Sequence, residues 1–175
     1  MKRALSAIGF HGTSKSNYEG IKRQGFLLSD NSYDWLGVGF YFFQDAPNRA
    51  KEWAKRHEDP IIIGAEISLD HCMDLLDNVW YELLHRVFIA YEGACRKKNI
   101  PMAIQTPGNH RRDKIVIDMA VRALAERGFS VKTVRSVFKE GPECFQNSAL
   151  TTQNHVQIAV RDISTIVDFW SEELN

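Results

Sequence analysis

The sequence predicts a single α+β domain that spans residues 1–175. Short runs of β-branched and aromatic residues alternate with segments whose apolar residues recur at helical spacing, so both strands and helices are expected. A chain of 175 residues can bury one sizeable core but is short for two. No internal repeat or low-complexity segment divides it, and we therefore expect one core.

The charge balance and the N-terminus narrow the function only slightly. The chain has 22 basic and 22 acidic residues, so no global field favours a polyanionic partner, although local patches remain open. The N-terminus is basic, but no apolar run long enough for a signal peptide or a membrane span follows it. We predict a cytoplasmic protein without a membrane partner.

The cysteines predict no metal site. Cys72, Cys95 and Cys144 are odd in number and lack zinc-site spacing, which is typical of buried thiols in a reducing compartment. His71 and Asp74 flank Cys72, but this spacing matches no familiar metal site. We expect a turn with solvated carboxylates there.

The first predicted elements are a strand over 5–11 and a short amphipathic helix. Residues 16–19 have the capping-box pattern that begins a helix, and Gly25 is well placed to end it. A polar loop over 29–34 leads into a central strand over 35–43.

A second helix follows the central strand. Asp45 is expected to cap it, with Pro47 in its first turn. Its apolar face should pack under the pocket described below. An apolar strand is predicted over 61–67.

The second half contains two longer helices and two strands. The helices are predicted over 79–98 and 113–127, and the strands over 131–138 and 155–162, with a long loop over 139–154. Apolar residues alternate in the last strand, so we expect it to have one core face and one presented face.

Two glycine-containing stretches carry the strongest functional signal. The central strand is entered through Gly37 and Gly39, which indicates a close approach of backbone to another group, such as a ligand. The plainer interpretation is that Tyr41 and its neighbours are core aromatics. Upstream, Phe10-His11-Gly12-Thr13 also leads from an apolar strand into a polar turn.

Together these stretches resemble the NAD-binding half of the ADP-ribosyltransferase superfamily, in the branch of poly(ADP-ribose) polymerases, diphtheria-type toxins and related bacterial enzymes. In that family one strand ends in His-Gly-Thr and another contains Gly-x-Gly-Ile-Tyr-Phe. The resemblance implies a split core of two small antiparallel sheets around an NAD cleft, with flanking helices.

The same resemblance implies roles for individual residues. His11 would hold a ribose hydroxyl, the Gly12 backbone would bind the nicotinamide amide, and Tyr41 would stack on the nicotinamide ring. Further NAD contacts are expected from three residues: Thr13, Gly39 and Trp53. Plain packing is an equal alternative for Trp53, and taken alone His11 would fit a core histidine.

The third residue of the family's His-Tyr-Glu triad is replaced here. The late strand of the family reads Glu-x-x-Val-x-Asp, and matching Val160 and Asp162 puts Gln157 in the position of the glutamate. Cleavage of the nicotinamide–ribose bond develops positive charge on the ribose, which a carboxylate stabilises and an amide does not. Glu140 or Glu143, in the loop that contacts the acceptor in this fold, are candidate substitutes.

The replacement predicts mono-ADP-ribosyl transfer rather than polymer growth, and the alternative is a module that binds NAD or ADP-ribose without turnover. An RNA 2′-phosphotransferase shares the fold, but the basic pattern of that family is not apparent. By analogy with compact bacterial relatives we expect an intracellular toxin or anti-phage effector, held by an antitoxin. Five cations favour a nucleic-acid acceptor slightly over a protein: Arg111, Arg112, Lys114, Lys132 and Arg135.

Overall fold

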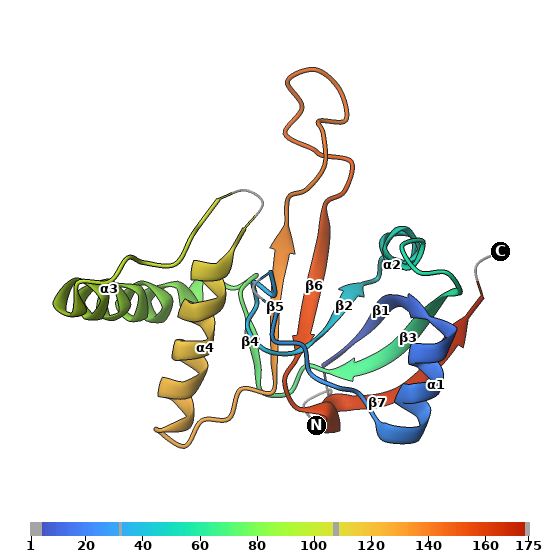
Figure 1. Ribbon diagram of the computed structural model, residues 1–175, viewed down its shortest axis with the longest axis horizontal. Coiled ribbons are helices and arrows are strands. Elements are labelled where there is room, and N and C mark those ends of the chain that lie inside the picture. The colour runs from blue at the N-terminus through green and yellow to red at the C-terminus, as the bar shows by residue number, and fades with distance from the viewer. Residues whose placement is uncertain (1–4, 32, 107–108, 174–175) are drawn as a thin grey trace.

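A seven-stranded mixed sheet runs through the part of the chain that the computed structural model describes, residues 5–31, 33–106 and 109–173 (Figure 1). Its strands are β1 (Ser6–Ser14), β2 (Phe40–Gln44), β3 (Pro60–Ser68), β4 (Cys72–Asp74), β5 (Thr133–Phe138), β6 (His155–Val160) and β7 (Ile166–Glu172). The helices are α1 (Lys15–Gln24), α2 (Pro47–Ala54), α3 (Tyr81–Lys98) and α4 (Arg111–Ala125), with 3-10 turns at Asn78–Trp80 and Ile163–Thr165. This mixture confirms the α+β class.

The strand order is β4-β5-β6-β2-β1-β3-β7, and neighbouring strands are antiparallel except β4 and β5. The expectation of two separate small sheets is therefore wrong, because β1 and β2 join the two halves. The join is narrow: within the described strands, β1 and β2 pair only where Gly9 lies opposite Gln44 and Phe10 opposite Phe43. Beyond Phe10 the ladder stops, which leaves a seam in the middle of the sheet.

Helices cover different parts of the sheet (Figure 1). Helix α2 packs on β1 and β3 through Ala50 and Ala54, both 0 % exposed. A Cβ at Gly12 would lie 2.0 Å from the Ala50 carbonyl oxygen, so the contact requires glycine in β1. Helix α4 covers the β4–β5 side through Ile117 and Ala120, and α3 packs mainly on α4.

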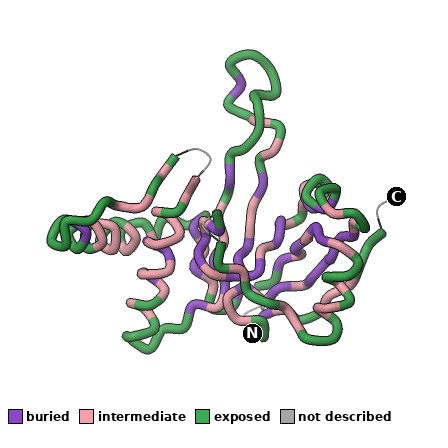
Figure 2. The backbone as a smooth tube through the Cα atoms, in the orientation of Figure 1, coloured by how far each residue is buried: buried purple, intermediate pink, exposed green. Residues whose placement is uncertain are grey.

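Both faces of β6 are covered. Ile158 belongs to a cluster with Phe40 and Phe42, while Ala159 belongs to a second cluster that includes Leu36. The expectation of one presented face is wrong, because Ala159 is 0 % exposed and His155 only 6 %. Figure 2 shows the buried residues concentrated on the strands, whereas the β5–β6 loop is largely exposed.

Several local predictions need correction. Strand β1 continues to Ser14, and this serine, rather than Ser16, caps α1 by accepting a hydrogen bond from the Asn17 N–H at 3.2 Å. Asp45 does not cap α2, because Ala46 occupies the cap position and Asp45 adopts a positive φ of 50°. Strand β7 was not predicted. Residues 1–4 and residue 32 of the predicted 29–34 loop lie outside the described residues.

Two of the predicted helix ends are confirmed. Gly25 follows α1 with φ of 83° and Gly128 follows α4 with φ of 81°, the left-handed region that glycine adopts without strain. The cysteines are not all buried as expected, since Cys95 is buried, Cys72 half-buried and Cys144 exposed. None of the helices in the described residues is long and apolar enough to cross a membrane.

Candidate active site

A cleft of about 670 Å³ opens where β1 and β2 diverge. Its volume lies in the range of small-molecule sites. Of the residues singled out in the sequence, five line it: His11, Tyr41, Trp53, Glu140 and Gln157. They come from β1, β2, α2, the β5–β6 loop and β6, so the fold gathers at one seam residues that are far apart in the sequence.

His11 bridges the seam with its side chain. Its Nδ1 donates a hydrogen bond to the Tyr41 carbonyl oxygen at 2.8 Å, and its ring packs on Phe40 with 4.4 Å between centroids. Burial lowers the pKa of His11 to about 4, although the bond to Tyr41 opposes this shift. The imidazole is therefore neutral at pH 7, with Nε2 left as a hydrogen-bond acceptor.

Gly12 turns its backbone towards the same seam. The Ile8 carbonyl accepts a hydrogen bond from the Asp45 N–H at 2.9 Å, so even-numbered residues of β1 direct their backbone groups to the β2 side. Phe10 finds its partner in Phe43, but no pairing with β2 is described for Gly12. A strand N–H and C=O without a strand partner need another polar group.

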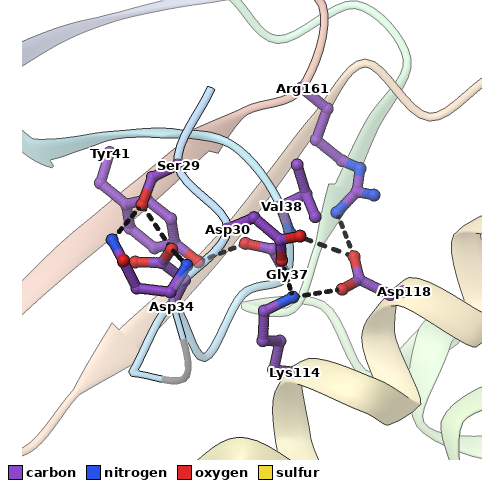
Figure 3. A network of polar contacts seen from close by, with 10 residues as sticks. Ser29, Asp30, Asp34, Gly37, Val38, Tyr41, Lys114, Asp118 and Arg161 are labelled. Atoms are coloured by element: carbon purple, nitrogen blue, oxygen red, sulfur yellow. Dashed lines mark hydrogen bonds and ion pairs between the residues drawn. The ribbon is translucent and has the colours of Figure 1, made fainter. Parts of the chain in front are cut away.

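The Tyr41 hydroxyl is hydrogen-bonded within the protein. It donates to the Gly37 carbonyl oxygen at 2.7 Å (Figure 3). Burial raises the pKa of Tyr41 well above its usual value, and the negative charge of Asp34 adds to this effect. The phenol stays neutral, so the ring is the part of Tyr41 that a ligand meets.

Gln157 faces the cleft from β6, directly opposite Phe43 in β2. Its Oε1 accepts a hydrogen bond from Trp35 Nε1 at 3.3 Å. Because the indole N–H only donates, this contact fixes the orientation of the amide. The Gln157 NH₂ group is then the donor that can reach a ligand oxygen.

The remaining wall comes from α2 and the loop after β5. Trp53 is 37 % exposed, and the Arg56 guanidinium carbon lies 3.8 Å from its ring centroid. Glu140 lies 3.0 Å from Nη2 of Arg49, whose side chain is 16 % exposed. Arg49 also pairs with Glu52 of its own helix.

Several expected contacts lie elsewhere. Glu143 does not line the cleft, since its carboxylate accepts the Asn147 N–H at 2.9 Å within the β5–β6 loop. Gly12, Thr13 and Gly39 do not line the cleft either, and Gly12 and Thr13 are buried. The Gly39 N–H and C=O pair with Ser29, and a Cβ at Gly39 would lie 3.1 Å from the Ala159 Cβ, so packing explains this glycine.

The predicted acceptor cations do not gather at the cleft. Arg111 is exposed, and Arg112 lines a separate groove of about 490 Å³ between α3, α4 and the sheet. Three further cations pair with aspartates: Lys114 with Asp30 and Asp118, Lys132 with Asp162, and Arg135 with Asp74.

The sequence interpretation missed the loop before β2. Ser29, Asn31, Tyr33, Asp34 and Trp35 all line the cleft, and His110 stacks on Trp35 with 4.5 Å between ring centroids. Asp34 organises the loop by accepting the Ser29 hydroxyl and the Asn31 N–H, both at 2.5 Å. The available signal was the high content of Ser, Asn and Asp in 29–34, because these side chains stabilise turns by hydrogen-bonding to nearby backbone groups.

Within the described residues, no group of three or more histidine, cysteine or acidic side chains is arranged to hold a metal ion. No protein-family model and no curated protein matches the sequence.

Proposed function

We propose that this chain is an NAD-dependent mono-ADP-ribosyltransferase, which transfers ADP-ribose from NAD to a macromolecule and releases nicotinamide. The observation that carries the proposal is the meeting of His11, Tyr41 and Gln157 at one cleft, each on a strand that carries one of the three motifs of the resemblance. NAD is a substrate here, and no metal is required.

The chain's groups suit the parts of NAD. The nicotinamide ring stacks on Tyr41, and its amide meets the Gly12 backbone, for which no pairing with β2 is described. A ribose hydroxyl donates to Nε2 of His11, which is neutral at pH 7. Trp53 and Arg56 form the wall over the rest of the dinucleotide.

The reaction breaks the bond between the ribose carbon and the nicotinamide nitrogen. The bonding electrons leave with nicotinamide, which becomes neutral, and positive charge develops on the ribose. The acceptor then attacks that carbon with a lone pair and loses a proton. Gln157 orients the ribose through a hydrogen bond but does not stabilise its charge.

The missing carboxylate limits the rate. At about 4 Å and an effective dielectric near 20, a carboxylate would contribute roughly 4 kcal/mol, or about a thousandfold in rate. Slow, single-unit transfer follows from its absence. Glu140 is the carboxylate at the edge of the same cleft, and its pairing with Arg49 reduces its effective charge.

We propose a macromolecular acceptor and a cytoplasmic toxin or anti-phage effector that a cognate antitoxin restrains. A nucleic-acid acceptor now depends on Arg111 and Arg112, because the other three cations have carboxylate partners. A protein acceptor is the competing case. Induced expression of the wild type should arrest growth, and expression of His11→Ala should not.

A non-catalytic NAD or ADP-ribose reader is the second candidate, and the uncharged Gln157 favours it. It predicts NAD binding without release of nicotinamide. An RNA 2′-phosphotransferase would instead consume NAD only when 2′-phosphorylated RNA is present.

The test is incubation of the purified chain with phosphate-labelled NAD and a cell lysate, followed by separate nuclease and protease digestion. Label lost to nuclease or to protease supports transfer and identifies the acceptor class. His11→Ala should abolish labelling, while His71→Asn, at an exposed histidine before β4 that lines neither the cleft nor the α3–α4 groove, should not. Binding of NAD by the wild type without any labelling or nicotinamide release would replace the transferase proposal with the reader.

A further inference from the structure

Charged side chains from three parts of the chain meet behind the cleft (Figure 3). Lys114 of α4 lies 2.7 Å from Asp30 and 2.9 Å from Asp118, and Arg161 lies 2.8 Å from Asp118. The side chains of Lys114, Asp118 and Arg161 are only 12 %, 21 % and 16 % exposed. We call these four residues the α4 latch.

The α4 latch also holds backbone. Oδ1 of Asp118 accepts the Val38 N–H at 3.1 Å, immediately before β2. Gly37 has a positive φ of 88°, and a Cβ there would lie 2.4 Å from Asp118 Oδ1 and 2.5 Å from Arg161 Nη1. The first glycine of the Gly-x-Gly motif therefore fits the latch and not a ligand.

This backbone turn leads directly to Tyr41. The Gly37 carbonyl receives the Tyr41 hydroxyl at 2.7 Å, so Asp118 is connected to the Tyr41 ring through a single turn of chain. The sequence between Ser29 and Gly39 has no helix or strand in its described residues, and these two residues pair with each other at its base. Polar contacts hold this segment together with the burial of Leu36, which is 2 % exposed and belongs to the core cluster of Ile117.

The segment has one side on the latch and one on the cleft. Asp30 contacts Lys114, whereas its neighbours Ser29 and Asn31 line the cleft. Burial alone would raise the pKa of Asp118, but Lys114 and Arg161 outweigh it and hold that pKa below its usual value. The carboxylate is thus charged at neutral pH. Its removal would leave Lys114 and Arg161, both half-buried, without the negative charge that lies between them.

We propose that Asp118 is a positioning residue that, with Lys114 and Arg161, fixes the cleft segment (residues 29–31 and 33–38) and the Tyr41 ring in the geometry that binds NAD. The NAD part of this inference rests on the proposed function. The positioning part does not, because it concerns the protein without ligand.

The chain offers a matched control. Asp74 pairs with Arg135 at 2.6 Å, and their side chains are 26 % and 15 % exposed, close to the values of Asp118 and Arg161. Neither residue lines the cleft. Asp74→Asn therefore breaks an ion pair of similar burial in another part of the sheet.

The first readout is amide hydrogen exchange without NAD. Asp118→Asn should speed exchange of Val38 and of the cleft segment by about tenfold or more, with the β1–β3 ladder unchanged. Asp74→Asn should leave the cleft segment at the wild-type rate. If Asp118→Asn does not fold, Asp30→Asn replaces it, because the Asp30 side chain is 72 % exposed and its loss removes one of the two carboxylates that pair with Lys114.

The second readout is the response to NAD. Asp118→Asn should raise the KM or Kd for NAD by about tenfold while kcat changes less, and Asp118→Glu should recover part of the affinity. Wild-type exchange in the cleft segment of the folded variants would overturn the positioning role, whatever NAD does. Faster exchange in Asp118→Asn, together with a wild type that does not bind NAD, would retain that role and reject the proposed function instead.

Discussion

Strand β2 has two antiparallel neighbours, and its ladder is complete with one of them but short with the other. On one side it pairs with β6 along its whole length, from Phe40 opposite Val160 to Gln44 opposite Val156. On the other it pairs with β1 at two positions, and the His11 side chain takes over where the ladder stops. The closed side builds the core, and the open side borders the cleft in which we propose that NAD binds.

The difference arises from what each neighbour packs against. Strand β6 is covered on both faces, which favours a continuous ladder. Strand β1 pairs with β3 along its whole length and packs on α2, where Gly12 contacts the helix backbone. The seam opens where β1 stays paired with β3 and no longer pairs with β2, and the cleft lies at this opening.

Gly12→Ala should have the largest effect, because it disrupts the contact between β1 and α2 on the open side of the seam. The new Cβ would overlap the Ala50 carbonyl at 2.0 Å and the Ala54 nitrogen at 2.6 Å, which are backbone atoms that cannot rotate away. We expect a loss of about 3 kcal/mol in the free energy of unfolding, measured by urea denaturation.

Gly20→Ala is the control for this substitution. Gly20 lies in α1, and a Cβ there meets nothing within 4 Å. Because alanine favours helix over glycine, the variant should gain up to about 1 kcal/mol. Equal stability of the two variants would mean that β1 and α2 are not as close as described.

His11→Asn should separate the two roles of the histidine, which are the hydrogen bond to the Tyr41 carbonyl and the acceptor at Nε2. The asparagine NH₂ can still donate to the Tyr41 carbonyl, but the Nε2 acceptor is lost. Nicotinamide release should fall about a hundredfold or more, with the fold retained by circular dichroism. Full activity in His11→Asn would remove His11 from the chemistry.

The same variant tests the pKa of His11. Its folded pKa of about 4 lies below the unfolded value of 6.5, so the unfolded state binds more protons between these values. Stability is therefore fully present above the unfolded pKa and is lost as the pH falls towards the folded pKa. At about pH 5 the wild type should lose roughly 2 kcal/mol more, relative to pH 7, than His11→Asn. Parallel pH profiles of the unfolding free energy would contradict the buried neutral imidazole.

Trp35→Phe should have the smallest effect. It removes the indole N–H that orients Gln157 but keeps an aromatic wall between the cleft and the α3–α4 groove. We expect a three- to tenfold fall in nicotinamide release, in line with one hydrogen bond of about 1 kcal/mol. A change beyond a hundredfold would indicate that Trp35 itself contacts NAD.

The sequence predicted the seam residues better than their surroundings. His11, Tyr41 and Gln157 were found through short motifs at strand positions, and the structure brings them to one cleft. The close approach predicted at Gly37 is confirmed, but the approached group is the ion pair of Asp118 in α4 and Arg161 just after β6, which only tertiary structure brings together.

What the sequence missed depends on contacts between distant segments. Asp34 was expected in an ordinary loop and Trp35 at the start of the central strand, but β2 begins only at Phe40 and both residues form the cleft wall before it, through hydrogen bonds that leave no periodic pattern. Strand β7 was missed because its burial does not alternate regularly. Glu140 and Glu143 were indistinguishable in the sequence, and only the Arg49 ion pair brings one of them to the cleft.

The most direct test of NAD binding at the seam is a crystal structure of the chain with NAD or with nicotinamide and ADP-ribose. The nicotinamide ring should lie on Tyr41, its amide at the Gly12 backbone in the open half of the β1–β2 seam, and a ribose hydroxyl at Nε2 of His11. A dinucleotide bound in the α3–α4 groove, or an empty seam at NAD concentrations that saturate binding in solution, would contradict it.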